Sequence, residues 1–275
     1  MAETLAITGV TQHTHPLLVN REIAIANAGT VWPPYSAFHL AEHTFNIAEK
    51  VAHRNAHTPI MLDVGTGSGI LPIMAKQFVP DAVFIATDLN ADATRLAEHN
   101  WKLNKLAPSD LTTMVADGMS PELVRLAAAQ GGVDVLLANL PQQPLVSNTD
   151  LPSLREKNAA AWNVDPSRDP DGLGIFMSVL SDAHMVMKDG GVALVSASSK
   201  QNKPRIDAFL NAMVSRGNAK SWNVVSTTRF DVPASYDREI IEHWRRMEEA
   251  DSVQRLFVGP NTQPQYDHYN IAINF

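Results

Sequence analysis

The fold is decided by one stretch of sequence, Met61-Leu62-Asp63-Val64-Gly65-Thr66-Gly67-Ser68-Gly69-Ile70-Leu71. Its apolar start predicts a buried strand, its end predicts a helix, and three glycines separate the two. Glycine has no Cβ, so the backbone of such a turn can approach a ligand closely at the carboxyl edge of a sheet. The stretch therefore predicts a cofactor-binding turn.

The spacing of the glycines indicates which cofactor is bound. A dinucleotide fingerprint needs its third glycine three residues after the second, where this chain has Ile70, and Gly69 comes one residue too early. Bound pyrophosphate favours a helix N-terminus without nearby anions, whereas the ammonium of S-adenosyl-L-methionine is attracted by an acid such as Asp63. The motif thus favours S-adenosyl-L-methionine. The turn residues expected to bind it are Asp63, Gly65, Thr66, Gly67 and Gly69.

Short apolar runs alternate with helical patterns from residue 60 onward, which is typical of a doubly wound α/β fold with a parallel sheet. Strands are expected at Ile60–Val64, Ala82–Asp88, Leu111–Ala116, Val133–Asn139, Gly191–Ser198, Trp222–Phe230 and Tyr269–Phe275. Helices are expected at Ile70–Phe78, Ala91–Leu103, Pro121–Ala129, Leu173–Met187, Pro204–Arg216 and Asp237–Leu256. One elaborated domain is the natural prediction for 275 residues without a composition shift.

The first 57 residues have a different pattern. Glu22–Ala26 and Thr30–Trp32 flank Asn27-Ala28-Gly29, which predicts a small hairpin, and a helix should follow over about Ser36–Ala52. We expect residues 1–57 to form an appendage over the cofactor mouth of a main domain at 58–275. Residues 145–171 are too long for an ordinary connection and suggest a lid-like substrate loop.

Acidic residues also end the next two strands. Asp88-Leu89 ends the second, where a carboxylate can accept both ribose hydroxyls, and Asp117-Gly118 ends the third, where an acid or its neighbouring amide faces the adenine. Together with the glycine turn, these residues make the chain resemble the class I S-adenosylmethionine-dependent methyltransferases over about residues 58–199. The resemblance implies a mostly parallel seven-stranded sheet whose last strand runs antiparallel.

The fourth strand ends in Asn139-Leu140-Pro141-Gln142, beside the expected methyl group. The segment resembles the Asn-Pro-Pro-Tyr motif of release-factor glutamine methyltransferases and adenine N-methyltransferases, which clamps a planar amide or amine. The chain keeps Asn139 and Pro141 but has Gln142 in place of the tyrosine, so the stacking ring is missing.

A closer resemblance is to the methyltransferase domain of methionine S-methyltransferases, over about residues 58–275. These enzymes carry Ile-Pro-Gln where this chain has Leu140-Pro141-Gln142, and a Gly-Leu-Gly turn like Gly172–Gly174. This resemblance implies transfer to the thioether of free methionine or a similar amino acid, which needs positioning and no general base. Asn139 and Gln142 would be catalytic, and Tyr35, Leu140 and Pro141 would line the acceptor site. The alternative is N-methylation of a protein glutamine side chain or another small amine.

The amino-acid composition limits the classes of partner that we expect the protein to bind. A net charge of −7 with scattered Lys and Arg disfavours nucleic acid, and the absence of cysteine excludes disulfides and thiolate chemistry. The first residues show no basic segment followed by an apolar run, and the sequence has no run of about 18 apolar residues, so we expect a cytoplasmic protein without membrane contact, of undetermined oligomeric state.

Two other classes remain open. His39-Leu40-Ala41-Glu42-His43 matches an inverted zinc-peptidase motif, which is a distant alternative, because the pattern is short and often matches by chance. An amphipathic helix with its polar face outward explains the same residues, and we expect no metal. A protein that binds S-adenosylmethionine without turnover is the non-enzyme alternative, and Asn139–Gln142 argues against it.

Overall fold

The structure is a computed structural model, and it describes residues 7–14, 22–28, 40, 45–51, 54, 57–140, 172–198, 203–231 and 265–275. The main strands are β3 (Ile60–Val64), β4 (Val83–Asp88), β5 (Leu111–Val115), β6 (Val133–Ala138), β7 (Met187–Ser198), β8 (Ser221–Asp231) and β9 (Gln265–Asn274). The helices are α2 (Ile70–Phe78), α3 (Ala91–Leu103), α4 (Pro121–Ala129), α6 (Gly174–Asp182) and α7 (Lys203–Ser215), with 3₁₀ turns η1 (Pro108–Asp110) and η3 (Ala183–Met185).

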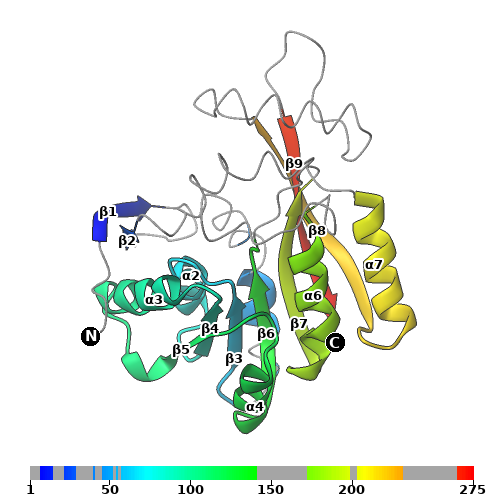
Figure 1. Cartoon of the computed structure of the whole chain (residues 1–275), viewed down its shortest axis with the longest axis horizontal. Coiled ribbons are helices and arrows are strands. Elements are labelled where there is room, and N and C mark those ends of the chain that lie inside the picture. The colour runs from blue at the N-terminus through cyan, green and yellow to red at the C-terminus, as the bar shows by residue number, and fades with distance from the viewer. Residues whose placement is uncertain are drawn as a thin grey trace.

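These strands form one seven-stranded sheet in the order β5-β4-β3-β6-β7-β9-β8 (Figure 1). The strands from β5 to β7 run parallel to one another, and β9 is antiparallel to both of its neighbours. The sequence order reverses at β3, so the chain winds outward from there in both directions. The predicted fold, including the antiparallel last strand, is confirmed.

Each face of the sheet has its own apolar core. In β3, Leu62 and Val64 belong to the core shared with α4, α6 and α7, whereas Met61 belongs to the core shared with α2 and α3. Successive strand side chains point to opposite faces, so Asp63 points to the same face as Met61, toward α2 and α3. The acid that opens the glycine turn is therefore buried on the α2 side.

A two-stranded hairpin of β1 (Ile7–Thr14) and β2 (Glu22–Ala28) packs against this second core through Ile23 and Ile25. The predicted hairpin is wrong, because Asn27 and Ala28 lie within β2, and β2 pairs with β1. Asn27 is extended since its strand is paired along its length, so it cannot serve as a turn. Of the helix expected over Ser36–Ala52, Leu40 and residues 45–51 are described, and all are helical.

The helix predicted at Leu173–Met187 is shorter than expected. It ends at Asp182, a 3₁₀ turn follows, and β7 begins at Met187, four residues before the predicted start. The Val133 N–H donates to the Val186 carbonyl, and Met187 pairs with Val133, so the chain enters the sheet before Gly190. The other strand and helix boundaries agree to within four residues where they are described. The helix at Asp237–Leu256 and the loop 145–171 lie outside the described residues.

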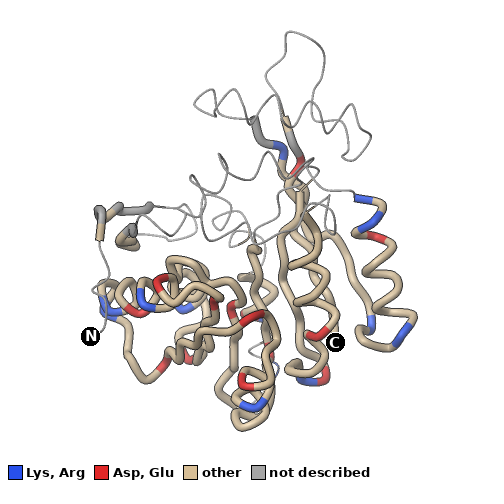
Figure 2. The backbone as a smooth tube through the Cα atoms, viewed as in Figure 1, with Lys and Arg blue, Asp and Glu red and all other residues tan. Residues whose placement is uncertain are grey.

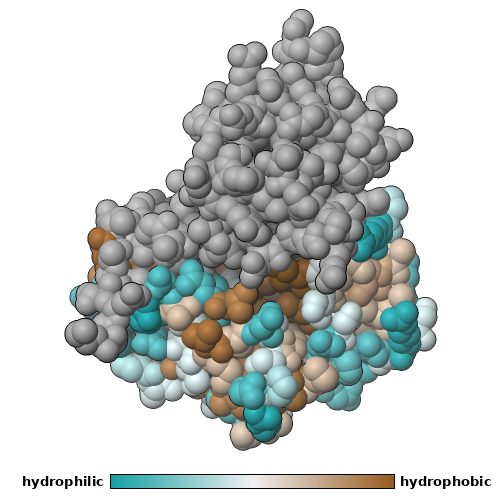
Figure 3. Space-filling model, viewed as in Figure 1, coloured by the Kyte–Doolittle hydropathy of each residue, from teal (hydrophilic) through white to brown (hydrophobic). Residues whose placement is uncertain are grey.

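Charge is dispersed over the part of the chain that the structure describes. Lys and Arg positions are scattered among Asp and Glu positions along the tube in Figure 2, and no described helix has an apolar stretch long enough to cross a bilayer. In Figure 3, apolar surface of the described residues gathers near the middle of this face, with hydrophilic surface around it.

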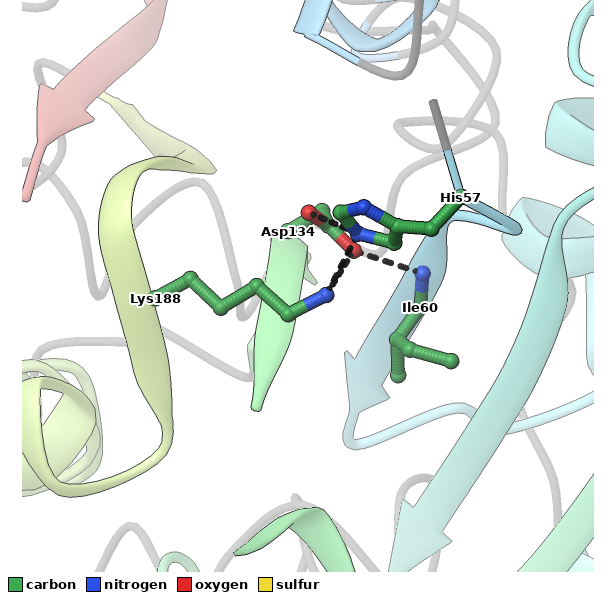
Figure 4. Close-up of polar contacts among 4 residues, drawn as sticks. All are labelled: His57, Ile60, Asp134 and Lys188. Carbon is green, nitrogen blue, oxygen red and sulfur yellow. Dashed lines mark hydrogen bonds and ion pairs between the residues drawn. The ribbon is translucent and has the colours of Figure 1, made fainter. Parts of the chain in front are cut away.

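A buried carboxylate joins three strands at the amino edge of the sheet (Figure 4). Asp134 accepts hydrogen bonds from the Ile60 N–H at 2.8 Å and from Lys188 Nζ at 2.7 Å, and its other oxygen lies 3.2 Å from His57 Nε2. Lys188 Nζ also lies 2.8 Å from His57 Nε2. This cluster ties the starts of β3, β6 and β7 together, at the edge opposite the glycine turn.

Replacing Asp134 with alanine should destabilise the fold, because the buried Ile60 N–H would lose its acceptor. We expect Asp134→Ala to lower the free energy of unfolding by roughly 1–3 kcal/mol, measured by urea denaturation. Asp189→Ala is the matched control, since it removes an exposed carboxylate that pairs with Lys220 at the surface and should change little. Equal losses in the two variants would contradict a structural role for the Asp134 cluster.

Candidate cofactor and acceptor site

The glycine turn between β3 and α2 is built from left-handed glycines. Gly65, Gly67 and Gly69 have φ values of 71°, 55° and 77°, a region that side chains rarely adopt. At Gly69 an added Cβ would lie 2.8 Å from the Ala97 Cβ on α3, so glycine is also needed for the close approach of that helix. The Thr66 N–H donates to the Thr87 carbonyl at 2.8 Å, which ties the turn to the end of β4.

Asp88, at the end of β4, is held by two backbone amides. One oxygen accepts a hydrogen bond from the Gly67 N–H and the other accepts one from the Asn90 N–H, both at 2.9 Å. Burial raises the pKa of Asp88, and these amides partly offset that effect. A carboxylate oxygen can accept more than one hydrogen bond, so both oxygens retain capacity for ribose hydroxyls. Asp88 therefore orders the turn as well as suiting the ribose role predicted for it.

Asp63 is fully buried beneath the turn, and its two oxygens have no hydrogen-bond partner among the described residues. Burial raises its pKa to about 7; the nearby Thr66 hydroxyl, outside hydrogen-bond geometry, opposes the rise, and the charge of Asp88 adds to it. The Thr66 and Ser68 hydroxyls are likewise buried without partners there. A ligand ammonium, which donates three hydrogen bonds, fits this cluster of acceptors.

The adenine end of the predicted site is more open. Leu89 follows Asp88 and is 54% exposed, an apolar side chain suited to cover a flat ring. The Ala116 N–H donates to the Asp88 carbonyl at 3.0 Å, so the ends of β4 and β5 are joined. Asp117 is exposed beyond this link, and Gly118 has a φ of 51°. The four residues predicted at this end are therefore placed next to one another in the fold.

Asn139 follows β6, the strand beside β3, and so emerges next to the glycine turn. Its side-chain oxygen accepts a hydrogen bond from the Ser196 hydroxyl at 2.6 Å, across from β7. Leu140 packs on the turn, with its Cδ2 only 3.0 Å from the place of a Cβ at Gly65. Ser196 was not predicted, because nothing in a strand sequence indicates which buried serine faces a neighbouring strand's end.

Several predicted site residues lie outside the described residues. Tyr35, Pro141 and Gln142 of the acceptor site belong to this group, as do His39, Glu42 and His43 of the zinc-peptidase motif. No group of three or more potential metal ligands occurs within the described part of the chain.

Comparison with known proteins agrees with this geometry. The family model for ribosomal protein L11 methyltransferase (PrmA) matches residues 44–158. The release factor glutamine methyltransferase of Deinococcus radiodurans is 29% identical over 158 residues, which cover 57% of this chain and 51% of that protein. The ribosomal protein L11 methyltransferase of Pelobacter propionicus is 39% identical over 89 residues, covering 32% and 26%.

Over the matched residues the chain is similar to class I S-adenosylmethionine-dependent methyltransferases. The matches agree with S-adenosyl-L-methionine as the cofactor that the glycine spacing predicts. The chain spans about half the length of the release-factor enzyme it matches and about a quarter of the L11 enzyme. The predicted closeness to methionine S-methyltransferases finds no support in these relatives.

Solved structures share the fold of this chain. The Thermus thermophilus 16S rRNA N2 G1207 methyltransferase, in complex with AdoMet and guanosine, has a TM-score of 0.55 at 10% identity, covering 98% of this chain and 51% of that one. The YcgJ protein of Bacillus has a TM-score of 0.50 at 16% identity, covering 85% and 98%.

Cofactor affinity should depend on the ionisation of Asp63. Its raised pKa means that the carboxyl is largely protonated below pH 7 without the cofactor, and an ammonium favours the charged form. Affinity for S-adenosylmethionine should therefore rise with pH and level off above about pH 7, with a slope of at most about tenfold per pH unit below it. Calorimetric titration from pH 6 to pH 8 measures this.

Asp63→Asn is the control for that profile. It should bind more weakly at pH 8 and lose the pH dependence, while the ligand's own titration is common to both proteins and cancels in the comparison. A variant with the wild-type profile would exclude Asp63 as the titrating group.

Asp88→Ala should weaken binding of both S-adenosylmethionine and its demethylated product. The change removes the anchor of Gly67 and the proposed ribose acceptor, each hydrogen bond to a charged group contributing roughly 1.5–3 kcal/mol. Asp81→Ala removes the same charge from an exposed turn before β4 and should leave affinity unchanged. Calorimetry at pH 8 distinguishes them, and wild-type affinity in Asp88→Ala would rule out the ribose assignment.

Proposed function

We propose that the chain transfers a methyl group from S-adenosylmethionine to a nitrogen on a protein, with a glutamine amide as the leading acceptor. The observation that carries this proposal is the position of Asn139 at the end of β6, next to the glycine turn and held by Ser196. Release factor glutamine and ribosomal protein L11 methyltransferases among its relatives support a protein acceptor over a small molecule. The stacking ring that glutamine enzymes carry is absent at Gln142, so other contacts must hold the amide.

The chain's own residues would perform three tasks. Asp63, with Thr66 and Ser68, would hold the ammonium of the cofactor, and Asp88 would hold its ribose. When bound, the cofactor supplies an electrophilic methyl group on a positively charged sulfur. Asn139, whose carbonyl oxygen accepts a hydrogen bond from the Ser196 hydroxyl, would orient the acceptor, because an amide side chain can both accept and donate hydrogen bonds. Such positioning accounts for much of the rate in an in-line transfer.

Free methionine is the second candidate acceptor, favoured by Leu140-Pro141-Gln142 in place of Asn-Pro-Pro-Tyr. A thioether has no proton to lose, so amide groups alone would suffice to grip the amino acid. Cytoplasmic localisation stays an expectation from the sequence for either acceptor.

A labelled-methyl screen separates the two acceptors. We expect transfer to a glutamine-bearing peptide or an intact release factor to exceed transfer to free methionine, and Asn139→Ala to reduce it by about 100-fold or more through the loss of a positioned acceptor. Asn211→Ala, which removes a remote asparagine on α7, is the matched control and should retain activity. If free methionine becomes labelled and the protein acceptors do not, the thioether reaction replaces the proposal. If the chain binds the cofactor but transfers the methyl group to no acceptor, the result favours a binding protein.

A further inference from the structure

Two asparagines, Asn100 on α3 and Asn104 at the C-cap of that helix, complete the open edge of β2. The Asn104 side chain accepts a hydrogen bond from the Ala24 N–H at 3.0 Å and donates one to the Ala24 carbonyl at 2.7 Å. Asn100, four residues earlier, accepts from the Ala26 N–H at 2.7 Å and donates to the Ala26 carbonyl at 3.2 Å. The two side-chain amides thus take the place of a neighbouring strand.

The match between helix and strand has a simple geometric basis. Four residues of an α-helix rise about 6 Å, and two residues of a strand rise about 6.7 Å. Side chains four positions apart on the helix can therefore meet backbone groups two positions apart on the strand, Asn100 with Ala26 and Asn104 with Ala24. The other edge of β2 is paired with β1. Ile23 and Ile25 are buried in the core that α2 and α3 share. The strand β2 is therefore held by its side chains as well as by the hydrogen bonds of its backbone.

The two asparagines differ in one contact. Asn100 Nδ2 also donates to the Ser68 carbonyl, at 2.8 Å, in the middle of the cofactor turn, and the Asn100 side chain is fully buried. Asn104 donates instead to the Asn100 carbonyl within its own helix. One amide group therefore contacts both the N-terminal strand and the glycine turn, and the other contacts the strand alone.

We infer that Asn100 is a positioning residue for the cofactor turn, and that through it the β1–β2 hairpin and the cofactor site are energetically coupled. Its hydrogen bond holds the Ser68 carbonyl between Gly67 and Gly69, whose left-handed conformations shape the turn. Without that bond, the turn has more conformations to lose on binding, which lowers affinity. The inference rests on the cofactor assignment and does not depend on the methyl acceptor.

The test compares Asn100→Ala with Asn104→Ala in the full chain. Both variants remove a pair of hydrogen bonds to β2, so both should lower the melting temperature. We expect Asn100→Ala to raise the Kd for S-adenosylhomocysteine by about tenfold, and Asn104→Ala to raise it by less than about twofold. Asn100→Ser, which keeps a smaller polar group, should lie between them and serves if the alanine variant does not fold.

Hydrogen exchange of the unmodified chain gives a second readout. S-adenosylhomocysteine should slow exchange of the Ala26 N–H, which is bonded to Asn100, more than that of the Ala24 N–H, which is bonded to Asn104. Equal losses of affinity in the two variants, or equal protection of the two amides, would overturn the coupling alone. A wild-type chain that does not bind S-adenosylhomocysteine would overturn the cofactor assignment and this inference with it.

Discussion

The contact between Gly69 and Ala97 is the constraint on which the cofactor half of the structure depends. Only a residue without a Cβ allows α3 to come this close to the first turn of α2. At that distance the helix brings Asn100 within reach of the Ser68 carbonyl, while the pairing of β4 with β3 brings Asp88 within reach of the Gly67 N–H. The close approach of the helix and the pairing of the two strands therefore order the turn together.

The site also concentrates buried polar groups whose partners a ligand would supply. Asp63, Thr66 and Ser68 have buried oxygens without partners among the described residues, an arrangement that costs free energy in the absence of a ligand. The raised pKa of Asp63 reflects the same cost, since the fold holds a carboxyl where its charged form is poorly solvated. An ammonium ligand converts this cost into binding free energy. By contrast, the buried Asp134 at the opposite edge has Lys188 and the Ile60 N–H as partners, as expected of a structural carboxylate.

The acceptor half rests on less extensive contacts. Asn139 is oriented by Ser196, and Leu140 packs on Gly65, so the residues that would meet the acceptor are attached to the cofactor turn itself. Binding of the cofactor and placement of the acceptor would then share the same short segment between β6 and the turn. The proposed acceptor is a protein nitrogen, whereas the residues after Asn139 differ from the glutamine-enzyme motif.

The sequence by itself determined the sheet and the cofactor class. Apolar periodicity predicted α2, α3 and α4 with their observed bounds, and the glycine spacing after Asp63 indicated the cofactor, because both signals are local. Only the tertiary structure decided the partner of β2, the early start of β7, and the roles of Ser196 and Asn100. Each of these depends on contacts between residues far apart in the chain, such as Ala26 with Asn100 and Asn139 with Ser196, and a local pattern carries no record of which distant residue a polar side chain will meet.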